Sequence, residues 1–287
     1  MIYLLLAIAA STSILITFKI FEKYGIDNFT AITVNYIIGA IFGYNYIHFD
    51  LSVGSVLNAS WFVMSALTGI VLIIGFVAFS LSAQKAGIAI TAISSRMAVI
   101  ISVLSGILLF NDTAHLPKIA GIALAIVAFY FTLSKENVDK PEFKVLLLPF
   151  MVFIFMGVND LALKVTQFYF IEPGHDTAQT AYAATSFLWA FAIGTPVLIY
   201  RAFRLNQKIK LKSVMAGIFL GLINWYSIFY LLKGLEVMEI SVFIPLLNIS
   251  VVSLSAVTGY FIFHEKLSLK NWLGIITAII AILLIAY

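Results

Sequence analysis

The chain contains no cysteine and few charged residues. Without cysteine it forms no disulfide and has no thiolate to bind a metal ion. Only 10% of its 287 residues are charged and 62% are hydrophobic, whereas a soluble domain is about 25% charged. This composition excludes a water-soluble globular protein, which needs a largely polar surface, and an intrinsically disordered chain, which is poor in hydrophobic residues. The remaining class is a protein embedded in a lipid bilayer.

Long apolar runs with short polar breaks account for almost the whole sequence. A membrane-spanning helix needs about 20 mostly apolar residues, and these runs are too long and too continuously apolar for the strands of a membrane β-barrel. We predict an all-α polytopic membrane helix bundle of about ten transmembrane helices, with no room for a soluble catalytic domain. The predicted spans are Ile2–Phe18, Phe29–Ile47, Trp61–Ala83, Ile88–Phe110, Leu116–Leu133, Val145–Leu163, Thr177–Tyr200, Val214–Leu232, Ile240–Phe263 and Leu269–Tyr287.

The basic residues are unevenly distributed between the two sets of loops. Most of the 17 Lys and Arg residues lie in odd-numbered loops, including a group between Arg201 and Lys212. Basic loops remain in the cytoplasm, so we expect a plasma-membrane protein with both termini outside. The net charge of +4 then reflects membrane orientation, and we expect no nucleic acid partner.

Two helical hairpins resemble each other at one constant offset, which predicts an internal repeat. A repeat of five spans is odd, so its second copy enters the membrane from the opposite face. We therefore predict two five-helix inverted repeats, residues 1–134 and 144–287. Transporters built in this way bind substrate near the repeat interface. The aligned pairs are Val99 with Val252, Ser102 with Ser255, Gly106 with Gly259, Phe110 with Phe263, Asp112 with Glu265, Leu116 with Leu269, Gly121 with Gly274 and Ala125 with Ala278.

These hairpins also carry a family resemblance. The second reads Phe261-Ile-Phe-His-Glu265-Lys-Leu-Ser-Leu-Lys-Asn-Trp-Leu-Gly274, an acidic turn followed by a Trp-x-Gly helix start, and the first is a weaker copy. In these features the chain resembles the EamA-like branch of the drug/metabolite transporter superfamily. The resemblance implies ten spans in two halves and transport of small molecules. Many members of that family have cytoplasmic termini, so the direction of transport does not carry over.

Arg96 is the most informative single residue, because it lies in the middle of the fourth span. An arginine at a helix centre costs about 2.5–3.5 kcal/mol, so it should face a wet cavity or a partner. It either binds an anionic group of a substrate, such as a carboxylate, with its planar fork of donors, or it forms a structural ion pair.

Asp160, next to Asn159 in the sixth span, is the natural partner of Arg96. Asp160 is also the candidate for proton coupling, because a carboxylate shielded from water binds a proton more readily. The alternative for Asp160 is a local ion pair with Lys164, one helical turn away.

Three further residues complete the predicted substrate site. Asn224 and Trp225 lie in the eighth span, and Asn248 follows Pro245, which can kink the ninth span. Interhelical hydrogen bonds for the asparagines and aromatic packing for Trp225 are the alternatives. The predicted substrate-binding residues are Arg96, Asn159, Asp160, Asn224, Trp225 and Asn248.

Other motifs point to packing and capping. Gly39-x-x-x-Gly43 and Gly217-x-x-x-Gly221 permit close helix approach, and we expect it within the chain, with a homodimer as the alternative. Asp112 and Glu265 precede helices, where acids oppose the helix dipole, so we predict that both are capping residues.

We predict a secondary active transporter that moves small organic metabolites, such as amino acids or other carboxylates, by alternating access. A channel, a structural membrane protein and, last, an intramembrane enzyme are the alternatives. Without cysteine or an intramembrane histidine, we expect no catalytic residue and no enzyme. The four histidines are scattered, so we expect no metal site, and we expect no cofactor. The expected partners are a small-molecule substrate and the lipid bilayer.

The predicted orientation is testable by labelling. A cysteine placed in the loop between Arg201 and Lys212 should be shielded from impermeant thiol reagents in intact cells and should react after the membrane is permeabilised. Labelling of that cysteine in intact cells would contradict the orientation.

Overall fold

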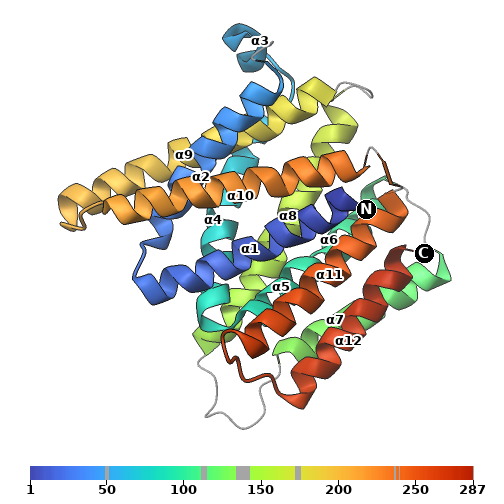
Figure 1. Cartoon of the computed structure of the whole chain (residues 1–287). Coiled ribbons are helices and arrows are strands. Elements are labelled where there is room, and N and C mark those ends of the chain that lie inside the picture. Colours follow the sequence, from blue (N-terminus) through green and yellow to red (C-terminus); the bar gives the residue numbers. More distant parts are fainter. Residues whose placement is uncertain are drawn as a thin grey trace. The chain divides into compact units, whose positions relative to one another are not determined.

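The structure is a computed structural model that describes residues 1–48, 52–110, 115–133, 143–171, 176–235, 237–238 and 240–286. Over these ranges every regular element is a helix (Figure 1). In the described part of the chain, nine helices are long and apolar enough to cross a membrane. The prediction of an all-α polytopic membrane bundle is therefore confirmed.

The helices follow the predicted spans in order, but those of the first and sixth spans extend six residues past the predicted ends, to Tyr24 and Tyr169, and two further features differ. The fourth span is divided into two helices, and α3 is a short helix that was not predicted. The second span forms a helix but is not among the nine, because three asparagines, Asn28, Asn35 and Asn45, lower its hydropathy. The helices are α1 (Ile2–Tyr24), α2 (Asn28–Tyr46), α3 (Val53–Leu57), α4 (Phe62–Lys85), α5 (Ile88–Met97), α6 (Val99–Phe110), α7 (Leu116–Leu133), α8 (Phe143–Tyr169), α9 (Asp176–Arg204), α10 (Leu211–Leu235), α11 (Ile240–Phe261) and α12 (Leu269–Ala286).

The helices form two compact units, and each unit draws segments from both halves of the sequence. Unit 1 comprises Met1–Ile20, Ala78–Gly157 and Tyr226–Tyr287. Unit 2 comprises Phe21–Val77 and Val158–Trp225. The compact units therefore differ from the predicted repeats, residues 1–134 and 144–287, and that division of the sequence stays a prediction.

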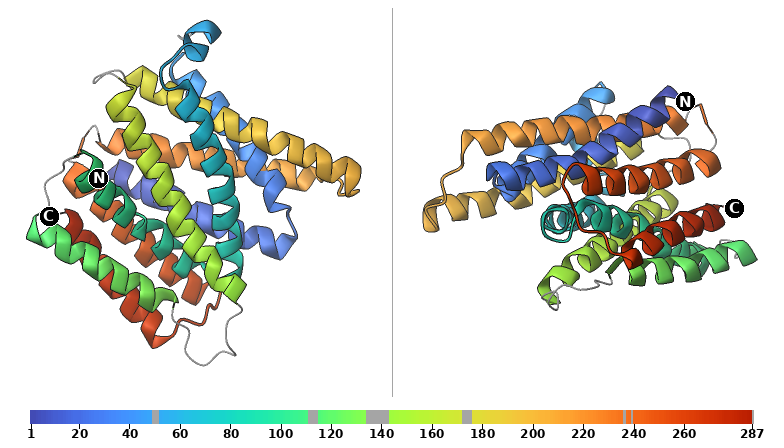
Figure 2. Two further views of the ribbon diagram at one scale, coloured as in Figure 1. Left: turned by 180° about the vertical axis from the view of Figure 1, so that it is seen from behind. Right: turned by 60° about the horizontal axis from the view of Figure 1, so that its bottom comes forward.

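The core of unit 1 is built around the antiparallel helices α7 and α12, which run side by side in every view (Figure 1, Figure 2). A Cβ placed on Gly121 of α7 would lie 2.8 Å from Ile285 Cγ1 near the end of α12. A Cβ placed on Gly274 of α12 would lie 2.7 Å from Thr132 Oγ1 near the end of α7. The two contacts are reciprocal, and they involve residues that the predicted repeat aligns with one another.

In unit 2 both small-residue motifs are covered by helices of the same chain. Gly39 and Gly43 of α2 lie against Phe187 and Ala184 of α9. On α10, Gly217 and Gly221 approach the backbone and side chains of α2 in the same close manner. Because glycine has no side chain, these helices can approach closely and increase their van der Waals contact. Intramolecular packing thus accounts for both motifs.

The close contact of Gly274 gives a stability prediction. We expect Gly274→Ala to destabilise the purified protein by about 1–3 kcal/mol, because the added methyl group would overpack the contact between α12 and α7. Thermal unfolding in detergent measures the effect. Gly54→Ala is the matched control, since a Cβ there would lie 3.9 Å from its nearest neighbour, Ser52 Oγ. Equal melting temperatures for the two variants would contradict this packing.

Candidate functional site

The fourth span is interrupted at one residue, Ala98, and Arg96 lies in the last turn before this break. Ala98 keeps right-handed helical backbone angles (φ −52°, ψ −22°), so the break is a local change within one continuous span. α5 ends at Met97 and α6 begins at Val99, with no proline or glycine at the junction. Three hydroxyl groups of the α5 segment, those of Thr91, Ser94 and Ser95, donate hydrogen bonds to carbonyls of the preceding turn. Such bonds compete with the helical pattern and favour bending. In lipid a break of this kind is tolerated where the backbone is buried in protein or lines a cavity.

Arg96 itself is half-buried. Its positive charge lies at the carbonyl end of α5, where the helix dipole favours a cation. A guanidinium group in this position presents several donors next to a helix break. This is a chemically suitable place to bind an anion or a carboxylate.

A pocket of about 200 Å³ lies in unit 1 and begins at the same break. It includes Val99, the first residue of α6, and Asn248 of α11, which is half-buried. Pro245, also in the lining, removes one backbone donor within the continuous helix α11. Asn248 contributes the polar side chain of an otherwise apolar wall. The lining residues are Val99, Ile244, Pro245, Asn248, Ile282, Ile285 and Ala286.

Asn159 and Asp160 lie on α8, in the part of that helix that belongs to unit 2. Asn159 is half-buried and Asp160 is exposed. Just before them, Gly157 makes a very close contact with Ile101 of α6. The pairing of Asp160 with Arg96, and the alternative pairing with Lys164, both stay predictions.

Asn224 and Trp225 have intramolecular partners within unit 2. The Asn224 side-chain amide donates a hydrogen bond to Asn35 Oδ1 at 3.1 Å. Trp225 is buried, with its ring 6.2 Å from that of Phe42 and 6.1 Å from that of Tyr46. These contacts are those expected if Asn224 forms an interhelical hydrogen bond and Trp225 packs against aromatic rings. Their participation in a substrate site stays a prediction.

Sequence reasoning missed Asn35, the partner of Asn224. Asn35 is fully buried, and its Nδ2 atom has no hydrogen-bond partner within the described part of the chain. The signal was present, because Asn35 lies in the middle of the second predicted span. The rule that selected Asn224 and Asn248 would have selected Asn35 as well.

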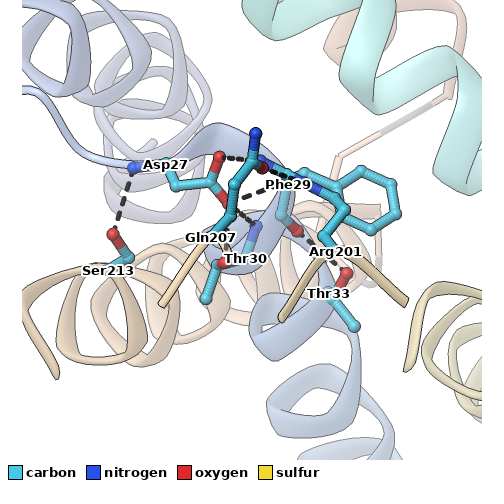
Figure 3. A network of polar contacts seen from close by, with 7 residues as sticks. All are labelled: Asp27, Phe29, Thr30, Thr33, Arg201, Gln207 and Ser213. Carbon is cyan, nitrogen blue, oxygen red and sulfur yellow. Dashed lines mark hydrogen bonds and ion pairs between the residues drawn. The ribbon is translucent and has the colours of Figure 1, made fainter. Parts of the chain in front are cut away.

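Sequence reasoning also missed an ion pair between Asp27 and Arg201 (Figure 3). Arg201 Nη2 lies 2.7 Å from Asp27 Oδ1, and Asp27 Oδ2 accepts a hydrogen bond from the Thr30 backbone N–H. Asp27 is the N-cap of α2, and its own N–H donates to Ser213 Oγ of α10. One aspartate therefore connects the ends of three helices: α2, α9 and α10.

The electrostatics of Asp27 favour its charged form. Partial burial alone would raise the pKa of this carboxyl, but hydrogen bonds from Arg201 and Thr30 and the charge of Arg201 outweigh it. The pKa of Asp27 is therefore lower than its ordinary value. Asp27 lies just before the second predicted span, so it acts at the boundary of the membrane region.

The prediction for Glu265 was right about capping but wrong about the helix. The following helix, α12, is capped by Ser268 and Asn271, because Asn271 Oδ1 accepts from the Ser268 N–H and Ser268 Oγ from the Asn271 N–H. The carboxylate of Glu265 instead accepts hydrogen bonds from Ile88 N–H, the first residue of α5.

The other predicted capping residue, Asp112, and one of the four histidines, His175, lie outside the described residues. Within the described ranges, no group of three His, Asp or Glu residues could hold a metal ion.

The helices and the broken span define a polytopic membrane protein, and comparison with known proteins places it in a family. The sequence profile of the EamA-like transporter family matches residues 143–287. The chain belongs to this family, which is part of the drug/metabolite transporter superfamily. Its members are membrane transporters of small molecules, not enzymes. The chain is also 26% identical over 294 residues to a protein of Haemophilus influenzae that is described as uncharacterized, covering 99% of this chain and 97% of that relative.

The Asp27–Arg201 pair gives a prediction about pH. Because the folded-state pKa of Asp27 is lowered, the pair stabilises the protein fully above the ordinary value of 3.8, and this stabilisation is lost as the pH falls through the folded-state pKa. We expect Asp27→Asn to cost about 0.2–1 kcal/mol at neutral pH through the lost ion pair with Arg201, because asparagine caps a helix about as well as aspartate does. The difference from the wild type should be constant between about pH 5 and 8 and should shrink in more acidic solution.

A double-mutant cycle with Arg201→Gln isolates the pair from other effects. The free energies of unfolding of the wild type, the two single variants and the double variant are compared. Additive effects at neutral pH would show that the two side chains do not interact.

Proposed function

We propose that the protein is a secondary active transporter of small organic metabolites that works by alternating access in the plasma membrane. The observation that carries the proposal is the break in the fourth span, with Arg96 just before it and the Asn248 pocket just after it. Broken helices near the middle of the membrane form the substrate sites of many secondary transporters. The interrupted span α5–α6 and the proline-containing helix α11 supply the polar groups here.

The size and lining of the pocket favour a particular class of substrate. Its volume of about 200 Å³ is smaller than that of drug-sized sites, which measure about 300–1,000 Å³. An apolar wall with a single amide suits a compact apolar body, and a nearby guanidinium suits a carboxylate. A small carboxylate such as an amino acid combines these two features.

Asp160 is the proposed site of proton coupling. A carboxylate within a membrane-spanning helix is costly unless it reaches water or a partner. Asp160 is exposed on α8 and not shielded as expected from the sequence, so the proposal depends on its lying within a membrane-spanning helix. The inclusion of Asn159, Asp160, Asn224 and Trp225 in the same substrate site as Arg96 is part of this proposal.

The arrangement of the loops supports the proposed orientation. At one end of unit 2, Asp27 pairs with Arg201 and the Lys212 ammonium group donates to the carbonyl of Tyr24. These contacts join the first and seventh loops of the ten-span topology. Both are odd-numbered and basic, and both are proposed to lie in the cytoplasm, so the termini would lie outside.

A ligand screen tests the proposed site. Purified wild type, Arg96→Ala and Asp160→Ala are melted in the presence of a metabolite library, because a ligand that binds only the folded state raises its stability. We expect a carboxylate to stabilise the wild type but not Arg96→Ala. Equal shifts in all three proteins would place the binding site elsewhere. If no compound in the library stabilises the wild type, the structural-protein alternative is favoured.

A further inference from the structure

Glu265 holds the beginning of α5, although the two lie far apart in the sequence. Its carboxylate oxygens Oε1 and Oε2 accept hydrogen bonds from the Ile88 N–H at 2.8 and 3.0 Å. The N-cap of α5 is Gly87, which has no side chain to make this bond. The first amides of a helix have no partner within the helix, and in a membrane protein the cost of leaving one unpaired is high. The negative charge also lies at the positive end of the helix dipole.

The surroundings of Glu265 leave space for this carboxylate. A Cβ placed on Gly259 would lie 2.5 Å from Glu265 Oε2, and one placed on Gly87 would lie 2.9 Å from the same oxygen. Gly87 has a φ of +113°, which side-chain-bearing residues rarely adopt. The Glu265 backbone N–H donates to the Gly259 carbonyl at 2.9 Å and so fixes the turn. The two glycines thus leave space for one carboxylate, and the hydrogen-bonded turn holds it there.

α5 is a short helix whose position depends on its two ends. It has ten residues, with Glu265 bound at its beginning and Arg96 in its last turn before the break at Ala98. Because a helix rises about 1.5 Å per residue, Arg96 lies about 12 Å along the axis from Ile88. Ala98 keeps helical backbone angles (φ −52°, ψ −22°), so α5 and α6 form one span with a local irregularity between them. Because α5 has only ten residues, we expect a change at Ile88 to alter the position of Arg96 in its last turn.

We propose that Glu265 is a positioning residue for the substrate site, because it holds α5 and thereby fixes Arg96 relative to the Asn248 pocket. The inference rests on the proposed function, since it takes Arg96 to be a substrate-binding residue. It also gives a physical role to the acidic turn of the second hairpin. In that turn Glu265 holds α5, and Asn271 donates a hydrogen bond to the Thr132 carbonyl of α7 at 2.8 Å.

The test uses the full-length protein in lipid nanodiscs and needs no substrate. Amide hydrogen exchange is measured for the beginning of α5, and phenylglyoxal modification is measured at Arg96. The other arginines, Arg201 and Arg204, are internal references in each sample. The proteins compared are the wild type, Glu265→Ala, Glu265→Gln and, as a control in the same turn, Lys266→Gln, whose side chain is exposed.

We expect Glu265→Ala to raise both the exchange of the α5 amides and the modification rate of Arg96 about fivefold, the effect of losing one helix cap. Glu265→Gln should recover part of this loss, because its amide oxygen can still accept the Ile88 hydrogen bond. Lys266→Gln and the reactions of Arg201 and Arg204 should match the wild type. A uniform rise in exchange that includes α7 and α12 would show a general structural role and overturn the inference.

The inference and the proposed function can fail separately. If Glu265→Ala leaves Arg96 modification unchanged, the positioning role is overturned, whatever Arg96 binds. If Arg96→Ala retains ligand stabilisation equal to that of the wild type, the proposed function fails, while faster Arg96 modification in Glu265→Ala still shows that Glu265 controls the position of Arg96.

Discussion

Lipid offers no hydrogen bonds to a polypeptide, and this constraint shapes the structure described here. In a chain with only 10% charged residues, most of which lies in lipid, the backbone N–H and C=O groups have to form their hydrogen bonds within the chain's own helices. Where a helix starts or is interrupted, another group has to supply the hydrogen-bond partner that the helix lacks. Asp27 does so for α2, Glu265 for α5, and the Ser268–Asn271 pair for α12. At these helix starts a polar side chain therefore supplies the hydrogen-bond partner that the helix itself lacks.

The break between α5 and α6 is where the chain departs from this regular pattern. It has no proline or glycine to explain it, and it lies between Arg96, in the last turn of α5, and Val99, which lines the pocket in unit 1. Such an arrangement is costly in lipid, and its retention fits a site that has to bind a polar solute in one state and release it in another. The contacts of unit 2 have a different character. Asn224, Trp225 and the glycine motifs of α2 and α10 mainly bring helices close together.

The overall fold could be predicted from the sequence because a membrane helix needs little more than a long apolar run. Finer features depended on contacts between residues distant in the sequence. Glu265 was expected to cap the helix that follows it, since nothing in its local sequence indicates that Gly87 leaves the start of α5 uncapped. Likewise, Asp27 gave no sign of its pairing with Arg201. Arg96 and Asn248 could be selected by their depth in apolar runs. The break at Ala98 has no proline or glycine to predict it, and the hydroxyl groups of Thr91, Ser94 and Ser95 before it are a weaker signal. Asn35 was overlooked although the same rule applies to it.

We propose that the protein carries its substrate by alternating access through a site that contains Arg96. Solute counterflow in proteoliposomes tests this claim most directly. Vesicles are loaded with the unlabelled carboxylate that best stabilises the wild type and are then diluted into a trace of the labelled compound. We expect the wild type to accumulate label transiently above its equilibrium level, as an exchanging carrier does, and Arg96→Gln to show no such overshoot. Simple equilibration without an overshoot in the wild type, at the same rate as in Arg96→Gln, would contradict the account.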